Sequence, residues 1–90
     1  MKQFDLPCYD SHKSFYGKAK VEDLGNEKIL YSYDTMVASI IGESFLRLWG
    51  GYSATTMRHV NSFLRHFGYS EGGKAFWDKC PVGEPVDLAA

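Results

Sequence analysis

Residues 55–66, TTMRHVNSFLRH, contain the dipeptide Arg-His twice, first as Arg58-His59 and then as Arg65-His66. The spacing of seven residues is close to two turns of an α-helix, so it predicts that both pairs lie on one side of a helix. Arginine offers a rigid fork of hydrogen-bond donors that suits a carboxylate, a phosphate or an aromatic ring. The repeat therefore favours a binding surface.

The distribution of charge supports this interpretation. The formal net charge of the chain is −1, but residues 44–70 contain three arginines and no Asp or Glu. Residues 1–43 contain seven acidic residues against five lysines. A solvent-exposed helix usually mixes acidic and basic residues, so the acid-free segment is typical of an interface; the alternative is that these residues only form the polar exterior that any surface helix needs. The predicted partner-binding residues are Arg47, Trp49, Arg58, His59, Ser62, Arg65 and His66.

A second candidate site lies at the start of the same helix. Two glycines let the backbone approach a ligand closely, and hydroxyl groups stand beside the free amides of the first turn, where anions bind. The alternative is structural, since glycines can end a strand and Ser53 can cap the helix. The residues of this predicted anion site are Gly50, Gly51, Ser53, Thr55 and Thr56.

Three residues near the two ends of the chain could bind a metal. Cys8 and His12 have a spacing that can hold zinc, and Cys80 could supply a third ligand. A fourth ligand would come from Asp10, His59 or His66. In the alternative reading, both cysteines are small buried apolar residues and no cofactor is bound.

Catalysis finds little support in the sequence. The predicted helix has no acidic residue, which excludes the Glu-bearing zinc-protease motif. No signature of a nucleophilic site surrounds Cys8 or Cys80. The chain is therefore not expected to be an enzyme.

The elements that would position these residues follow from hydrophobic periodicity. Alternating apolar and polar residues predict four strands, and the short turns between them imply an antiparallel meander. The strands are expected at residues 14–22, 28–33, 36–41 and 44–49.

A helix is predicted to follow the sheet, because the period changes at Ala54. Ser53 is the expected N-cap and Gly68 the expected C-terminal stop. The stripe that should face the sheet is Met57, Val60, Leu64 and Phe67. The opposite, outer side should carry Thr55, Arg58, His59, Ser62, Arg65 and His66.

The expected fold is α+β, a four-stranded antiparallel meander packed against one main helix, with a short helical turn at Lys74–Lys79. Ninety residues, 44% of them hydrophobic, make one domain over residues 1–80, followed by an extended tail at 81–90. No apolar run approaches the ~20 residues of a membrane span, and no signal peptide is recognisable, which predicts a cytoplasmic protein. The final Leu-Ala-Ala is similar to the end of a bacterial degradation tag.

The block LWGGYSATTMRHVN, residues 48–61, resembles a family of short uncharacterised proteins carried by phages and mobile elements of gut Firmicutes. The similarity also includes residues 14–19 and 32–35, and covers roughly residues 6–80. It implies no known activity. Its context implies an accessory protein that binds and inhibits a host defence complex, a protein or ribonucleoprotein, as anti-CRISPR proteins do.

A different likeness supports an alternative function. Antiparallel strands followed by a helix are similar in layout to the plant ethylene-response-factor type of DNA-binding domain, which reads the major groove with strand Arg and Trp residues. Arg47 and Trp49 match that style, although the preceding strands offer Tyr31 and Tyr33 where that family has arginines. The alternative is a small DNA- or RNA-binding regulator that uses Arg47, Trp49, Arg58 and Arg65.

Overall fold

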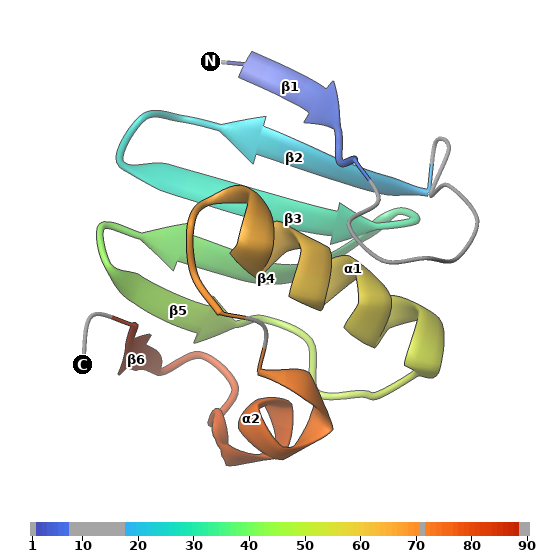
Figure 1. The fold of residues 1–90 in the computed structure, drawn as a ribbon, viewed down its shortest axis with the longest axis vertical. Helices are drawn as coiled ribbons and strands as arrows, with labels where there is room; N and C mark the ends of the chain where they lie inside the picture. The colour runs from blue at the N-terminus through green and yellow to red at the C-terminus, as the bar shows by residue number, and fades with distance from the viewer. Residues whose placement is uncertain (1, 8–17, 71, 89–90) are drawn as a thin grey trace.

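The computed structural model describes residues 2–7, 18–70 and 72–88. Its elements are β1 (Lys2–Asp5), β2 (Ala19–Asp23), β3 (Glu27–Ser32), β4 (Thr35–Ile41), β5 (Ser44–Arg47), α1 (Ala54–His66), α2 (Gly73–Lys79) and β6 (Pro85–Asp87). The strands form one antiparallel sheet in chain order, and both helices lie on the same face of it (Figure 1). The α+β class and the meander are as the sequence predicts.

The sheet has six strands, however, where the sequence predicted four. The four predicted strands correspond to β2–β5, although β2 begins at Ala19 and residues 14–17 lie outside the described part of the chain. Strands β1 and β6 extend the two edges, where Phe4 pairs with Val21 and Val86 pairs with Phe45. They have only four and three residues, which is too short for an alternating pattern to be recognised. Part of the predicted tail is thus a strand of the sheet.

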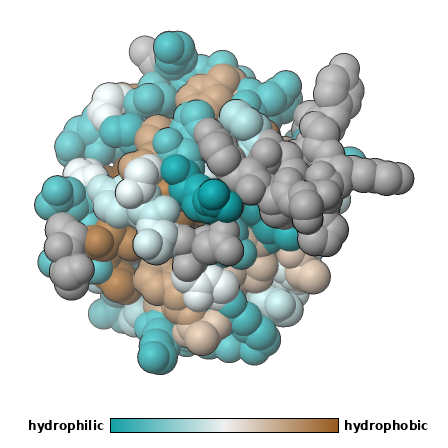
Figure 2. Space-filling view, viewed as in Figure 1, coloured by the Kyte–Doolittle hydropathy of each residue, from teal (hydrophilic) through white to brown (hydrophobic). Residues whose placement is uncertain are grey.

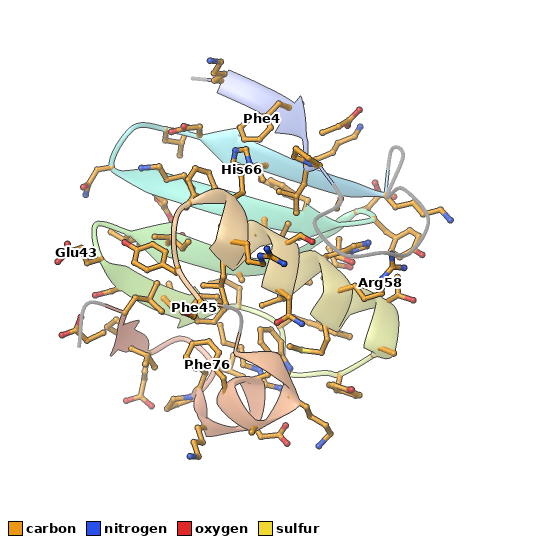
Figure 3. The ribbon with its side chains drawn as sticks, in the orientation of Figure 1. Phe4, Glu43, Phe45, Arg58, His66 and Phe76 are labelled. Atoms are coloured by element: carbon orange, nitrogen blue, oxygen red, sulfur yellow. The ribbon has the colours of Figure 1, made fainter. Side chains whose placement is uncertain are left out.

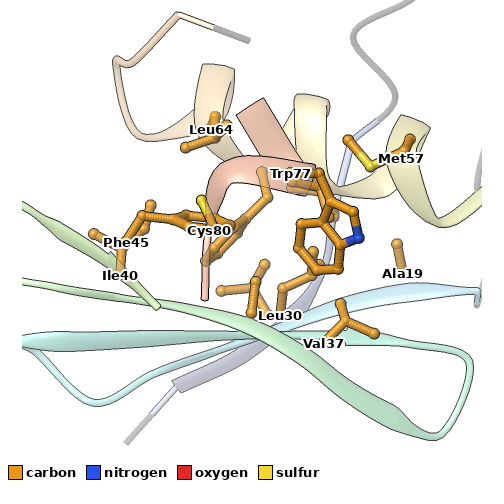
Figure 4. Close-up of a cluster of buried hydrophobic side chains, with 14 residues drawn as sticks. Ala19, Leu30, Val37, Ile40, Phe45, Met57, Leu64, Trp77 and Cys80 are labelled. Carbon is orange, nitrogen blue, oxygen red and sulfur yellow. The ribbon is translucent and has the colours of Figure 1, made fainter. Parts of the chain in front are cut away.

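The hydrophobic core fills the space between the sheet and the two helices. Phe45 of β5 and Phe76 of α2 lie ring to ring, with centroids 5.2 Å apart (Figure 3). The close-up shows Trp77 of α2 and Leu64 of α1 on the helix side of the same buried cluster as Leu30 and Val37 of the sheet (Figure 4). Burial of these side chains is the main force that holds the helices against the sheet.

Helix α1 begins and ends as its sequence predicts. The Ser53 hydroxyl accepts a hydrogen bond from the Thr56 amide at 3.0 Å, so Ser53 is the N-cap. At the other end Gly68 has a φ of +88°, a left-handed conformation that glycine adopts at low cost. Its amide donates to the Arg65 carbonyl, and the Tyr69 amide donates to Leu64, which together make a Schellman motif.

The two helices differ in length and in what stabilises them. Helix α1 has 13 residues, whereas α2 has seven and is too short to be stable by itself. Only Trp77 of α2 is fully buried, so this side chain anchors the helix. In the described part of the chain no helix is long and apolar enough to cross a membrane.

Candidate functional site

The two Arg-His pairs do not form one exposed surface. Arg65 is exposed and Arg58 is partly exposed, but His59 is completely buried, so its predicted place on the outer side is wrong. Successive helical residues differ in direction by about 100°, so the Arg and the His of one pair cannot share a face. Figure 3 shows Arg58 in the first half of α1 and His66 at its end beside Phe4.

The histidine side of α1 packs against the sheet. His59 Nδ1 lies 2.7 Å from Ser32 Oγ, and the ring centroid of His66 lies 5.3 Å from that of Phe4. Ser62, also predicted to face a partner, is buried. Seven of the thirteen residues of α1 are buried, because the helix packs against both β3 and α2. The apolar stripe in the sequence predicts one buried side of α1, and it does not reveal that α1 also contacts α2.

Arg47 is an interior residue, which corrects its assignment to the partner-binding surface. It is 9% exposed and shares the helix-side face of β5 with Phe45, two residues earlier. The guanidinium lies 4.3 Å from the centre of the Trp77 ring. It donates hydrogen bonds to five backbone carbonyl oxygens, those of Trp49, Gly50, Gly51, Trp77 and Cys80, at 2.9–3.4 Å. These donors hold the molecule together and do not face a partner.

The predicted anion site has a structural account for most of its residues. The carbonyl oxygens of Gly50 and Gly51 accept from Arg47, and that of Gly51 also accepts from the Trp77 indole. A Cβ at Gly51 would lie 2.4 Å from the Trp49 ring, so a larger residue there would force that ring to move. Thr56 is buried and Thr55 is half-buried, and the Ser53 hydroxyl caps the helix. Anion binding at this helix start stays a prediction.

The predicted zinc ligands can be placed only in part. Cys8, Asp10 and His12 lie outside the described residues. Within residues 2–7, 18–70 and 72–88, no group of three or more potential ligands is close enough to hold a metal. Cys80 is a core residue, and burial raises the pKa of its thiol, while the positive charge of Arg47 partly opposes that rise.

The helix-bearing face of the molecule mixes hydrophilic and hydrophobic residues, with hydrophilic ones at its rim (Figure 2). The opposite face of the sheet, called here the helix-free face, has a more ordered composition. Strand pairing places Ile29 between Glu22 and Ser39 on that face. The whole central row is Gln3, Glu22, Ile29, Ser39, Leu46 and Pro85. Its apolar members do not belong to the core cluster under the helices.

Hydrophobic side chains form the middle of the helix-free face, and carboxylates surround them. Met36 and Ile41 are 45% and 38% exposed, and they flank the more buried Ile29 and Leu46. By strand register, the acidic residues on this face are Asp5, Glu22, Glu27 and Asp87. Among the described strand residues of this face, Lys20 is the single base. The face is therefore apolar at its centre and net negative at its rim.

A pocket of about 430 Å³ lies where this face meets the β3–β4 turn. We call it the tyrosine pocket; its lining residues are Gln3, Lys20, Tyr31, Tyr33 and Asp34. The Tyr31 hydroxyl donates to Glu22 Oε1 at 3.3 Å. Burial, and then the charge and hydrogen bond of Glu22, raise the pKa of Tyr31.

A sequence model described as a family of unknown function (DUF8033) matches residues 5–79. The chain belongs to that family. Neither a curated protein nor a solved structure matches it. The predicted resemblance to an uncharacterised family over roughly residues 6–80 is thereby confirmed over residues 5–79. The DUF8033 match runs from the last residue of β1 to the last residue of α2, so β6 lies beyond it.

Sequence reasoning did not identify the tyrosine pocket of this DUF8033 protein. The signal was present in β3, where Glu27, Ile29 and Tyr31 alternate with helix-facing residues and so predict a second patterned face. The turn residues gave no comparable signal. Nothing in the sequence indicates that Tyr33 adopts a φ of +58°, because bulky residues are rare in that conformation.

Proposed function

We propose that this protein acts by binding a protein partner through its helix-free face. The main observation is that Met36 and Ile41, near the two ends of β4 on that face, are exposed and that no helix of the described chain covers them. Large hydrophobic side chains that gather on one exposed face mark interaction surfaces. Aliphatic anchors surrounded by a polar rim are also the usual anatomy of a protein–protein interface.

The charges of the face select the kind of partner. Four carboxylates and one ammonium group repel a phosphate backbone, whose binding depends on Lys and Arg. The same rim attracts a protein surface that carries basic residues around an apolar patch. The nucleic-acid alternative is also weaker in detail, because Arg47 is buried and Trp49 is partly packed against the core.

A double substitution at these two exposed positions tests the binding surface. Met36→Lys with Ile41→Lys removes two apolar anchors and adds positive charge opposite a basic partner. We expect capture of the partner from a bacterial lysate to fall at least tenfold, about 1.4 kcal/mol or more. The melting temperature should change little, because both positions are exposed.

The matched control is Arg58→Ala with Arg65→Ala, on the helix side. If this control loses the partner and the Met36/Ile41 variant keeps it, the helix side is the interface and our assignment is wrong. Nuclease treatment is applied to every sample. Loss of the captured partner after nuclease would support the alternative, a nucleic-acid-binding regulator.

We propose further that the partner is a host defence complex that handles nucleic acid, and that the protein inhibits it in the host cytoplasm. Such complexes carry basic channels, and the carboxylates of the helix-free face would occupy them in place of phosphates. The phage and mobile-element context implied by the sequence resemblance points the same way. In cells that express a panel of CRISPR effectors, co-expression of this chain should reduce plasmid interference by at least one of them. Full interference by every effector would contradict the target class and leave the binding surface to be judged by the capture experiment.

A further inference from the structure

One residue of the tyrosine pocket, Tyr33, has an unfavourable backbone conformation. Tyr33 has a φ of +58°, a left-handed backbone conformation that bulky residues with a Cβ rarely adopt. Asn or Gly would satisfy this turn more cheaply. The turn instead fixes an aromatic residue that is 54% exposed, with its amide donating to the Lys18 carbonyl at 2.6 Å. A strained and exposed aromatic residue beside a pocket indicates a role in binding.

The groups around the pocket suit a planar cation. The lining includes two tyrosines, Tyr31 and Tyr33, and the acidic residue Asp34; the Tyr33 ring also lies 6.0 Å from the ring of His59, centroid to centroid. Glu22 adds a second carboxylate, since it accepts the hydrogen bond from Tyr31. Rings and carboxylates together recognise a guanidinium, which stacks on aromatic faces and donates a fork of hydrogen bonds to a carboxylate.

Lys20 is the group that opposes a cation in this pocket. It is paired across the strands with Asp5, so a carboxylate stands opposite it on the same face. In the lining itself Asp34 balances Lys20, and the neighbouring residues Asp5 and Glu22 add two carboxylates against the one ammonium of Lys18, so the local charge is −1. The Gln3 side chain adds a neutral carbonyl acceptor. The balance favours a positively charged ligand over a phosphate.

We propose that the tyrosine pocket receives an arginine side chain of the protein partner. This inference rests on the proposed function, because the pocket lies at one end of the helix-free face. The aliphatic centre of the face then supplies contact area, and the pocket supplies selectivity for a partner that places one arginine at a fixed distance from its apolar patch.

The test uses the whole chain and a small probe, N-acetyl-arginine amide, followed by shifts of the backbone amide signals in NMR. We expect saturable shifts at Gln3, Tyr33 and Asp34. The matched neutral probe, N-acetyl-citrulline amide, has nearly the same shape without the charge, and it should bind at least about tenfold more weakly. Inorganic phosphate should leave these signals in place.

Two variants separate a role in binding from a role in folding. Tyr33→Asn removes the ring but suits the positive φ, so its melting temperature should stay within about 5 °C of the parent while arginine binding is lost. Tyr31→Phe keeps the ring and should bind within about threefold of the parent. Equal binding of the two probes, or unchanged binding by Tyr33→Asn, would overturn the proposal. Shifts caused by phosphate alone would overturn it in favour of an anion site at Lys20.

The partner experiment distinguishes this inference from the function on which it rests. If Tyr33→Asn fails to bind the arginine probe and captures the partner at least tenfold more weakly, the inference is supported. If it captures the partner as well as the parent does, the inference is wrong while the helix-free face can still be the interface. Ile41→Lys alone decides that second point, because Ile41 lies at the opposite end of β4 from the pocket, whereas Met36 pairs with Tyr31.

Discussion

Replacing Arg47 by alanine should lower the free energy of unfolding by about 3–5 kcal/mol, because it leaves buried carbonyl groups without their donor. A domain of ninety residues has a total stability of about 5–13 kcal/mol, so this one change removes a large part of it. Arg47 accounts for so much because its five hydrogen bonds join three segments, the end of β5, the Gly50-Gly51 loop and the end of α2. Chemical denaturation followed by circular dichroism measures the loss.

The geometry of the guanidinium matters as well as its charge. Arg47→Lys keeps a positive charge but has three donors and no planar surface to stack on Trp77, so it should recover only part of the lost stability. Arg65→Ala is the matched control, since Arg65 is exposed and its removal should change stability by less than about 0.5 kcal/mol. Identical unfolding of the Arg47→Ala variant and the parent would show that the carbonyl contacts contribute nothing.

Trp77→Ala should also lower the free energy of unfolding by about 3–5 kcal/mol. In addition, it should allow α2 and β6 to detach from the rest of the fold. Trp77 is completely buried, its indole donates to the Gly51 carbonyl at 2.9 Å, and its ring meets Phe45 edge to face. Helix α2 depends on this side chain, so it should unfold locally and detach β6 from β5. Trp77→Phe keeps most of the packing and should cost about 1–2 kcal/mol.

Cys80 offers a local measurement of that release. Its thiol is 2% exposed in the native protein, so alkylation should be slow there. When α2 detaches, the thiol becomes accessible and its rate of alkylation should rise well before global unfolding. Mass spectrometry of the peptide that contains Cys80 separates this signal from Cys8. A Trp77→Ala variant in which Cys80 stays protected would contradict the role of Trp77 as the anchor of α2.

The sequence predicted those elements whose signals are local. The cap at Ser53, the stop at Gly68 and the helix between them follow from hydrogen bonds and backbone preferences within a few residues. Strands β3, β4 and β5 were predicted because each carries a run of alternating or apolar residues between turns.

What the sequence could not predict depends on contacts between distant segments. Arg47 lies on an alternating strand whichever face is buried, and only the positions of α2 and the glycine loop decide that its charge points inward. His59 is buried because the end of β3 lies against it, through Ser32. In both cases a polar residue is buried with tertiary hydrogen-bond partners, which the periodicity of a single element does not encode.

The order of the strands has a consequence for how the chain folds. Every strand pairs with the next strand in the sequence, but α1 and α2 separate β5 from β6, so the pairing of Val86 with Phe45 closes a long loop. Closing that long loop costs more chain entropy than forming a hairpin such as β3–β4. Folding should therefore proceed by local hairpins, with the docking of α2 and β6 as the last step. During synthesis, strands β1–β5 leave the ribosome first, and their core stays incomplete until α2 and β6 have also emerged.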